Sequence, residues 1–434
     1  MKPVLALALL TLAWQSVTAA EARDLSLDAH LSYGYSAAAS TSTQQIIRLV
    51  PGFRIDFSPR TRVVLEGRLH LDFADQLEPG KADAQSYSSL SRPAVIDNLG
   101  TAEIRDAYVE STLDNGLLRL GKQQVVWGKL DGLKVLDVLN PQNFREFILD
   151  DFSESRISLW SAYLDVTLGA WRTEFALIPD NTGHAVPTRG AWFELTAPRY
   201  RFGASPGDPA VPVVTHRESV GFSSSAYAMR LSREVGAFEL GAIAYSGLDH
   251  EPLGRLIDNG GGTTVEQFYE RRDVFGLSAE TSFSSFALRA EVAMQPDRKF
   301  NTRTPGALST VELDQLRAGI GVDIDGPWNT FINIQYLHDD IRDAPRSLVS
   351  PDRERIVTAF LRRSFNYDAI ELIARMYHSL DFDDEMYSVA LEFSFGDSTR
   401  LEFAANAFSG SPTGIFGQFA DKDRVTLGLE HTFE

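Results

Sequence analysis

The chain has 434 residues, of which 44% are hydrophobic, and its 59 acidic and 41 basic side chains give a formal net charge of −18. This excess of negative charge excludes nucleic acid as the expected partner, because nucleic-acid binding needs a basic face. The chain contains no cysteine, which excludes disulfides and thiolate metal ligands. No segment has the roughly 18 consecutive apolar residues of a membrane-spanning helix.

The N-terminus has the layout of a secretory signal peptide. Lys2 supplies a positive charge, residues 4–13 form an apolar run, and small residues follow with fitting cleavage sites after Ala19 and Ala22. The run is too short to span a bilayer. We therefore expect residues 1–22 to be removed when the protein is exported.

A period of two residues recurs through the rest of the chain, residues 23–434. In one example Val63, Leu65 and Leu69 alternate with Glu66 and Arg68. Such alternation predicts strands whose two faces meet different environments, and in a transmembrane barrel the apolar face points to lipid. There are about 18 such segments of about ten residues each, the length that a tilted spanning strand needs, and 16 is the alternative count. They begin near Leu25, Ile46, Arg62, Ala102, Leu117, Leu159, Trp171, Ser225, Phe238, Val274, Phe286, Leu313, Trp328, Glu354, Ala369, Asp384, Thr399 and Arg424.

The connections between these segments alternate in length. Short turns, such as residues 58–60 and 114–116, alternate with longer connections, such as residues 74–101 and 180–224. Short periplasmic turns and long extracellular loops are typical of outer-membrane barrels. The sequence therefore predicts an all-β fold, a transmembrane antiparallel β-barrel in the bacterial outer membrane with both termini periplasmic. The register is ambiguous over residues 122–127, where a β-bulge would resolve it.

Aromatic residues cluster at the strand ends, as expected for girdles at the two membrane interfaces. One set flanks the short turns and the C-terminal end. It consists of Phe57, Trp171, Phe238, Phe283, Phe286, Trp328, Phe365, Phe395 and Phe433.

The polar face of the strands predicts a charged lumen lining, because a charge facing lipid at mid-depth costs about 2–4 kcal/mol. The candidate lumen and selectivity residues are Arg68, Arg172, Arg230, Arg289, Arg317, Arg375, Glu66, Glu174, Glu291 and Glu371. They fit a cross-strand network of arginines and carboxylates that holds the wall. They also fit a row of arginines that conducts anionic solutes.

The connection over residues 128–158 is too apolar for a solvated loop. Loops of this length are usually functional, and an apolar one has to be buried, so we expect it to fold into the lumen as a constriction. A lid packed on the barrel mouth is the alternative. The candidate constriction residues are Trp127, Asp131, Asp137, Asn140, Pro141, Arg145, Asp150 and Asp151.

A motif at the start of this connection resembles a known family. Residues 121–128 read G-K-Q-Q-V-V-W-G and are followed by Asp137, Asn140 and Pro141. This pattern resembles a porin-like outer-membrane family of unknown function in proteobacteria, whose members carry G-[RK]-Q-x-V-x-W-G and then an asparagine-proline segment. The strand plan is also similar to that of the alginate-export porin. The resemblance implies passage of an organic solute.

The C-terminal segment, residues 425–433, resembles the last strand of outer-membrane barrels, which ends on an aromatic residue read by the assembly machinery. Here Phe433 is that residue, and Glu434 follows it. The expected partners are therefore the barrel-assembly machinery, the lipid bilayer with its lipopolysaccharide, and a small-molecule solute.

The expected function is a porin-like channel for small or oligomeric organic solutes, anionic ones among them, with no enzymatic activity, cofactor or metal. One alternative is a sheath or partner barrel for an export or electron-transfer complex. A third is a hydrolase at the barrel rim that resembles omptin-type proteases, because a histidine–aspartate pair can act as a general base. Its candidate residues are His338, Asp339, Asp340, His378, Ser379, Asp381, Asp383 and Asp384.

Overall fold

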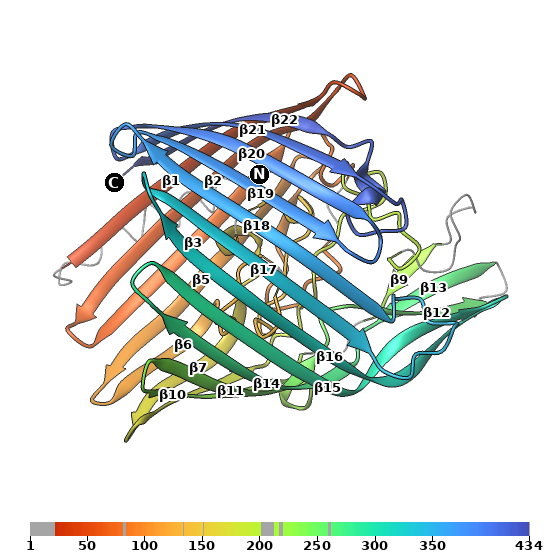
Figure 1. The fold of residues 1–434 in the computed structure, drawn as a ribbon, viewed down its shortest axis with the longest axis horizontal. Coiled ribbons are helices and arrows are strands. Elements are labelled where there is room, and N and C mark those ends of the chain that lie inside the picture. The colour runs from red at the N-terminus through yellow and green to blue at the C-terminus, as the bar shows by residue number, and fades with distance from the viewer. Residues whose placement is uncertain are drawn as a thin grey trace.

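The computed structural model describes residues 22–80, 84–132, 134–150, 152–200, 212–216, 220–258 and 262–433. Residues 1–21 of the expected signal peptide and Asp151 of the expected constriction lie outside these ranges. Eighteen antiparallel strands form a closed barrel (Figure 1). The predicted all-β barrel of about 18 strands is confirmed, and the alternative of 16 strands is wrong.

Each barrel strand pairs with its neighbours along the chain, and the last strand pairs with the first. This closing register runs from Leu27 opposite Phe433 to Tyr35 opposite Val425. The barrel strands are β1 (Ala22–Ser36), β2 (Thr41–Ser58), β3 (Thr61–Asp72), β5 (Gly100–Leu113), β6 (Gly116–Gln123), β7 (Leu159–Leu168), β8 (Trp171–Ile178), β10 (Ala226–Val235), β11 (Phe238–Leu248), β14 (Arg271–Ser282), β15 (Phe286–Thr304), β16 (Ala307–Gly326), β17 (Thr330–Ile341), β18 (Arg353–Phe365), β19 (Ile370–Ser379), β20 (Asp384–Phe395), β21 (Thr399–Ser409) and β22 (Arg424–Phe433).

Short and long connections lie at opposite ends of the barrel. At one end the connections have two to four residues, as between Ser58 of β2 and Thr61 of β3. At the other end lie the long connections from β3 to β5, β6 to β7 and β8 to β10. The C-terminus lies with short turns on the left of Figure 1. The connection from β1 to β2, residues 37–40, departs from the expected alternation because it is short although it lies at the long-loop end.

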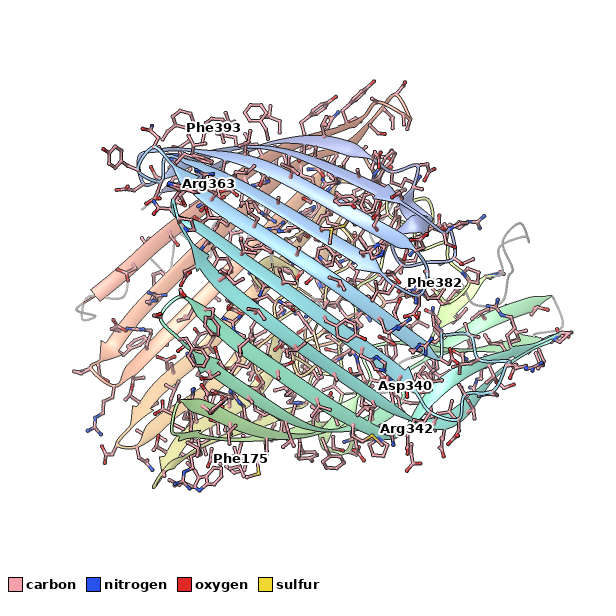
Figure 2. The ribbon with its side chains drawn as sticks, viewed as in Figure 1. Phe175, Asp340, Arg342, Arg363, Phe382 and Phe393 are labelled. Atoms are coloured by element: carbon pink, nitrogen blue, oxygen red, sulfur yellow. The ribbon has the colours of Figure 1, made fainter. Side chains whose placement is uncertain are left out.

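The two faces of the wall differ as the sequence pattern requires. Large apolar side chains such as Leu65, Leu277 and Ile320 are 41%, 60% and 51% exposed on the outside of the barrel. Figure 2 shows Phe175 and Phe393 on this outer surface. Their polar neighbours along each strand, such as Glu66, lie on the lumen side. This arrangement matches an apolar solvent outside and a polar interior.

The aromatic set at the short-turn end is also on the outer surface. All nine residues of that set are exposed large hydrophobics, with Trp328 reaching 76%. Amphipathic and aromatic rings are favoured at the boundary between lipid and water. Arg363 lies beside Trp328 and Phe365, with its guanidinium carbon 5.6 and 4.7 Å from the two ring centroids, so this rim also offers a cation to the boundary region.

The bulge expected over residues 122–127 was wrong, and β5 contains one of the register shifts that the described wall does have. Strand β6 stays in continuous register with β5 and β7 up to Gln123, after which the chain leaves the wall. The register shift occurs where β3 pairs with β5, because Asp106 lies opposite Glu66 but Ile104 lies opposite Gly67. The extra residue is Arg105, so Arg105 and Asp106 both face the lumen although they are adjacent.

Several smaller elements are not barrel strands, although the first of them pairs with β5 of the wall. The elements are β4 (Ala94–Ile96), α2 (Phe152–Ser155), β9 (Val213–Thr215), β12 (Leu253–Asp258), β13 (Thr263–Phe268), η1 (Phe222–Ser224) and η2 (Gly417–Phe419). β9, β12 and β13 form a separate sheet at the long-loop end, on the right of Figure 1. Asn301 of the extended β15 joins this sheet to the barrel, since it accepts a hydrogen bond from the Gly254 N–H at 2.9 Å and donates to the Gly254 carbonyl at 2.6 Å.

Candidate functional site

The chain leaves the wall after β6 and returns to it at β7, and we call residues 124–158 the inserted segment. Asn140 ties the two ends of this segment together. Its Oδ1 accepts a hydrogen bond from the Val125 N–H at 2.8 Å, and its Nδ2 donates to the Ile157 carbonyl at 2.8 Å. Asn140 is buried, and buried backbone groups need such partners. Asn140 thereby forms a neck where the inserted segment joins the wall.

Trp127 anchors the outgoing side of this neck to the barrel wall. Its Nε1 donates to the Glu174 carboxylate at 3.2 Å, and the Tyr163 hydroxyl donates to the same oxygen at 2.5 Å. Arg230 lies 3.2 Å from the other oxygen. All these side chains are buried, so one carboxylate in the wall fixes the position of the indole.

The residues that follow Trp127 bring the two arms of the segment together. A Cβ on Gly128 would lie 2.8 Å from the Cβ of Asp137, so the close approach requires glycine. The Asp137 carboxylate pairs with Lys134 and Arg156, each at 2.9 Å, and the Pro141 carbonyl accepts the Ile157 N–H at 2.9 Å. The motif that carried the family resemblance therefore builds the neck.

Beyond the neck, apolar side chains of the segment pack on the lumen face of β14 and β16. A Cβ on Gly276 would lie 2.3 Å from the Leu136 Cδ2, and one on Gly319 would lie 2.3 Å from the Leu130 Cδ1. The two glycines thus leave room in the wall for two leucines of the segment. Glu291 of β15 accepts the Leu136 N–H at 3.1 Å, which satisfies a buried backbone group between them.

Charged side chains reinforce this contact with the wall. Lys129 of the segment pairs with Glu239 at 3.0 Å and with Glu280 at 2.7 Å. Asp131 pairs with Arg289 at 2.9 Å. The segment therefore satisfies wall charges on β11, β14 and β15 and reaches well away from the strand where it began.

The later part of the segment packs against the last strands of the barrel. The Phe147 ring lies 6.3 Å from that of Phe408 and 4.8 Å from that of Phe419, in tilted geometries that favour aromatic packing. Glu146 forms a buried ion pair with Arg424 at 2.7 Å. The inserted segment thus contacts the wall on β14–β16 and on β21–β22.

Glu154 on α2 meets a cluster of three wall arginines. Its carboxylate lies 2.5 Å from Arg105, 3.4 Å from Arg48 and 3.6 Å from Arg68. Burial raises the pKa of Glu154, but attraction to the three guanidiniums outweighs this and holds its pKa below the usual range. Arg68 also pairs with Glu103 at 2.5 Å.

Two cavities border this cluster. The larger has a volume of about 410 Å³ and is bounded by β1, β2, β3, β5, β6 and β22 together with Glu154. Its lining is polar, and Val50 is the one aliphatic side chain among the described residues that line it. Arg48 lines both cavities, so it stands between them.

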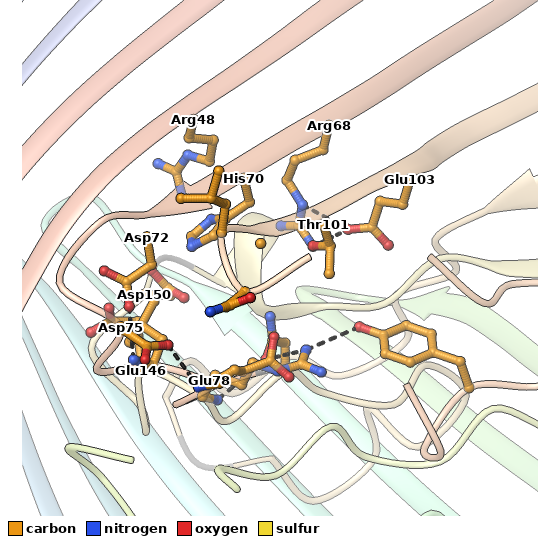
Figure 3. Close-up of a pocket in the computed structure, with 18 residues that line it drawn as sticks. Arg48, Arg68, His70, Asp72, Asp75, Glu78, Thr101, Glu103, Glu146 and Asp150 are labelled. Atoms are coloured by element: carbon orange, nitrogen blue, oxygen red, sulfur yellow. Dashed lines mark hydrogen bonds and ion pairs between the residues drawn. The ribbon is translucent and has the colours of Figure 1, made fainter. Parts of the chain in front are cut away.

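The smaller cavity, of about 50 Å³, lies under the connection from β3 to β5 (Figure 3). Arg145 of the inserted segment crosses it and pairs with Glu78 at 2.8 Å, while also donating to the Tyr87 hydroxyl at 3.3 Å. Asp150 lines the same cavity. Burial, with a smaller contribution from the nearby Glu146 carboxylate, raises the pKa of Asp150 to about 6.

The candidate lumen residues take part in contacts across neighbouring strands or with the inserted segment. The ion pairs are Arg68 with Glu103, Arg172 with Asp165, Arg230 with Glu174, Arg289 with Asp323, Arg317 with Asp339, Glu66 with Arg105 and Glu371 with Arg362. The Arg375 guanidinium lies 5.9 Å from the Phe360 ring centroid, and Glu291 accepts backbone N–H groups of the inserted segment. Paired charges of this kind stabilise a barrel wall.

Sequence reasoning missed several residues of the site. Arg105 was not predicted to face the lumen because the β5 bulge breaks the period of two. Glu154 was not predicted because it lies in a connection that has no such period. His184 and His250 were also missed, although His184 accepts the Gln142 N–H at 2.8 Å. The two rings of this pair have centroids 5.5 Å apart. Burial lowers the pKa of His250 to about 4, so this contact is between neutral rings near pH 7.

The candidate rim residues have different partners. His338 and Asp339 are consecutive in β17 and point to opposite faces, with Asp339 paired to Arg317 at 3.2 Å. Asp381 binds Arg355 at 2.8 Å, and Asp384 accepts backbone N–H groups that follow β21. Among the described residues, no group of three or more His, Asp or Glu side chains could hold a metal ion. No helix in that part of the chain is long and apolar enough to cross a membrane.

Solved structures with the same fold are outer-membrane proteins. OccK9 (OpdG) of Pseudomonas aeruginosa is 13% identical, with a TM-score of 0.51 over 96% of this chain and 99% of that one. OccAB3 of Acinetobacter baumannii is 9% identical, with a TM-score of 0.51 over 95% of this chain and 99% of that one. At these identities the likeness shows the fold alone.

Comparison of the sequence with protein families gives a second match. Residues 74–379 match a family described as "Protein of unknown function (DUF1302)". The matched range includes the neck motif and the whole inserted segment. No curated protein matches the chain.

Proposed function

The chain belongs to the DUF1302 family of unknown function, and we propose that it is a porin-like channel of the bacterial outer membrane. The observation that carries the proposal is the closed barrel of 18 strands with an apolar exterior and a charged interior. A wall of this kind is stable in lipid and offers polar solutes a route through it. The proposed solutes are small or oligomeric organic molecules, anionic ones among them, and the proposal includes no enzymatic step.

The proposed orientation places both termini on the periplasmic side. It is supported by the short turns, which share one end of the barrel with the C-terminus. Long loops then face the lipopolysaccharide, and the strand that ends at Phe433 faces the compartment of the assembly machinery.

The inserted segment is proposed to be the constriction of this channel. Its contacts with β14–β16 and with β21–β22, described above, support a path across the lumen. Most of its described apolar side chains are buried, among them Leu130, Leu136 and Phe147, whereas Val126 is 45% exposed. The solute route would then pass through the polar space beside the segment, where the larger cavity lies.

Planar-bilayer conductance of the purified protein tests the proposal. Replacing residues 129–136 by two glycines should keep the neck, because Gly128 and Asp137 already lie close together. We expect small channels from the wild type and larger ones from this variant. A matched control replaces residues 255–258 and 263–266 in the outer hairpin by glycine–serine and should leave conductance unchanged.

The same measurement separates the channel from a sheath or partner barrel. A barrel that only encloses or supports another protein would show no conductance when purified, neither as the wild type nor as the variant that lacks residues 129–136. That result would refute the channel proposal.

A further inference from the structure

Arg48 has hydrogen-bonding capacity that the described residues do not use. Its one ion pair among them is the 3.4 Å contact with Glu154, and its guanidinium donates no hydrogen bond there. By contrast, Arg68 donates to Glu103 at 2.5 Å and Arg105 donates to Glu154 at 2.5 Å. Because a guanidinium has five N–H donors in a fixed fork, Arg48 can donate hydrogen bonds to a further planar anion.

The position of Arg48 makes this capacity accessible. The side chain lines both cavities, including the larger one of about 410 Å³. The other carboxylates that line that larger cavity also have partners. Glu66 lies 3.3 Å from Arg105, Asp106 accepts the Ser158 hydroxyl at 2.6 Å, Asp28 accepts the Thr432 hydroxyl at 2.7 Å, and Glu430 lies 3.8 Å from Arg400. Although five carboxylates and three arginines line this cavity, the Arg48 guanidinium is the group whose hydrogen-bond donors are left for a solute.

Glu154 fills this place only in part. It reaches Arg48 and Arg68 at 3.4 and 3.6 Å, beyond hydrogen-bonding distance for a well-formed pair, and it is close only to Arg105. It sits on α2, a four-residue helix in the inserted segment and not in the wall. A carboxylate on such an element can be displaced without breaking the barrel.

We infer that Arg48, flanked by Arg68 and Arg105, is a binding subsite for the carboxylate of a solute, and that Glu154 competes for this subsite. The inference rests on the proposed channel function and names its substrate class. The polar cavity beside Arg48, with Val50 as the one aliphatic side chain among its described lining residues, fits a hydroxylated carboxylate such as a sugar acid. Bidentate guanidinium–carboxylate pairing supplies the selectivity.

Binding is tested with gluconate, and with glucose as its neutral counterpart, by saturation-transfer NMR on the detergent-solubilised barrel. Wild type should bind gluconate in preference to glucose. Glu154→Gln keeps the shape but removes the competing charge, so gluconate should bind about tenfold more tightly, the equivalent of about 1.4 kcal/mol. Arg48→Gln should abolish the preference. Glu266→Gln makes the same change in an ion pair of the outer sheet with Arg255 and should match wild type.

The outcomes separate this inference from the channel proposal. Equal binding of gluconate and glucose, or equal gluconate binding by wild type, Arg48→Gln and Glu154→Gln, overturns the subsite. Retained heat-modifiable gel mobility shows that each variant is folded, and Arg48→Lys, which keeps the charge, gives a second test with partial binding expected. In planar bilayers, the gluconate-to-potassium permeability ratio should rise in Glu154→Gln. Selective binding without any conductance would refute the channel and leave the subsite standing.

Discussion

Substitution of Asn140 by alanine tests how the inserted segment is held. The change removes two hydrogen bonds of 2.8 Å and leaves the Val125 N–H and the Ile157 carbonyl buried without those partners. Each unsatisfied group costs about 1–3 kcal/mol, so the free energy of local opening should fall by about 3 kcal/mol. At about 1.4 kcal/mol per factor of ten, amide exchange in the neck should accelerate about 100-fold.

Hydrogen–deuterium exchange with mass spectrometry measures this effect directly. Peptides from residues 124–158 should lose protection in the Asn140→Ala variant, while peptides from β14–β16 should keep theirs, because the wall pairs independently of the neck. Asn115→Ala is the matched control, since the Asn115 side chain makes a long hydrogen bond, of 3.4 Å, in an exposed short turn. Equal exchange of the segment in wild type and Asn140→Ala would refute the role assigned to this side chain.

Three further predictions concern the same segment. Leu136→Ala should create a cavity against β14, destabilise the docked segment by about 2–5 kcal/mol and raise channel conductance. The control Leu120→Ala, on the lipid face, should leave conductance unchanged. Equal conductance of Leu136→Ala and wild type would contradict the packing of Leu136 on β14. Because the pKa of Glu154 is lower in the folded protein, its ionised form stabilises the fold above the unfolded pKa of about 4.3, and this stabilisation is lost as pH falls through the lower folded pKa. Amide exchange in α2 should therefore become faster on acidification in the wild type. The Glu154→Gln variant should lose this pH dependence. The pH dependence expected from Asp150 has the opposite sign, because its pKa is raised in the folded protein. The protonated carboxyl stabilises the fold at low pH, and this stabilisation is lost as pH rises through about 6. Asp150→Asn should remove this change from amide-exchange rates measured from pH 4 to 8.

The wall could be predicted because each strand carries its own local pattern. Segments expected to begin at Leu159, Trp171, Phe238, Phe286 and Thr399 begin at those residues. Alternating burial and short turns are properties of neighbouring residues, so they are visible in the sequence. The same pattern also placed the aromatic girdle correctly.

The site was less visible because its geometry depends on residues far apart in the chain. The path of the inserted segment relies on Gly276 and Gly319, which in their own strands look like ordinary small residues. The cluster around Glu154 depends on the bulge at Arg105, and a single extra residue reverses every later inward or outward assignment in that strand. Neither feature leaves a local signal that identifies its partner.

The neck has a consequence for how the chain is assembled and how it can vary. The strands on the two sides of the inserted segment, β6 and β7, pair directly from Gly116 to Gln123. The wall can therefore form before the inserted segment docks in the lumen. Lengthening a loop whose ends are already held costs little, about 0.6 kcal/mol for each doubling of its length. The inserted segment can therefore be exchanged without changing the barrel. Replacing the residues beyond the neck would give the same barrel a constriction with different selectivity.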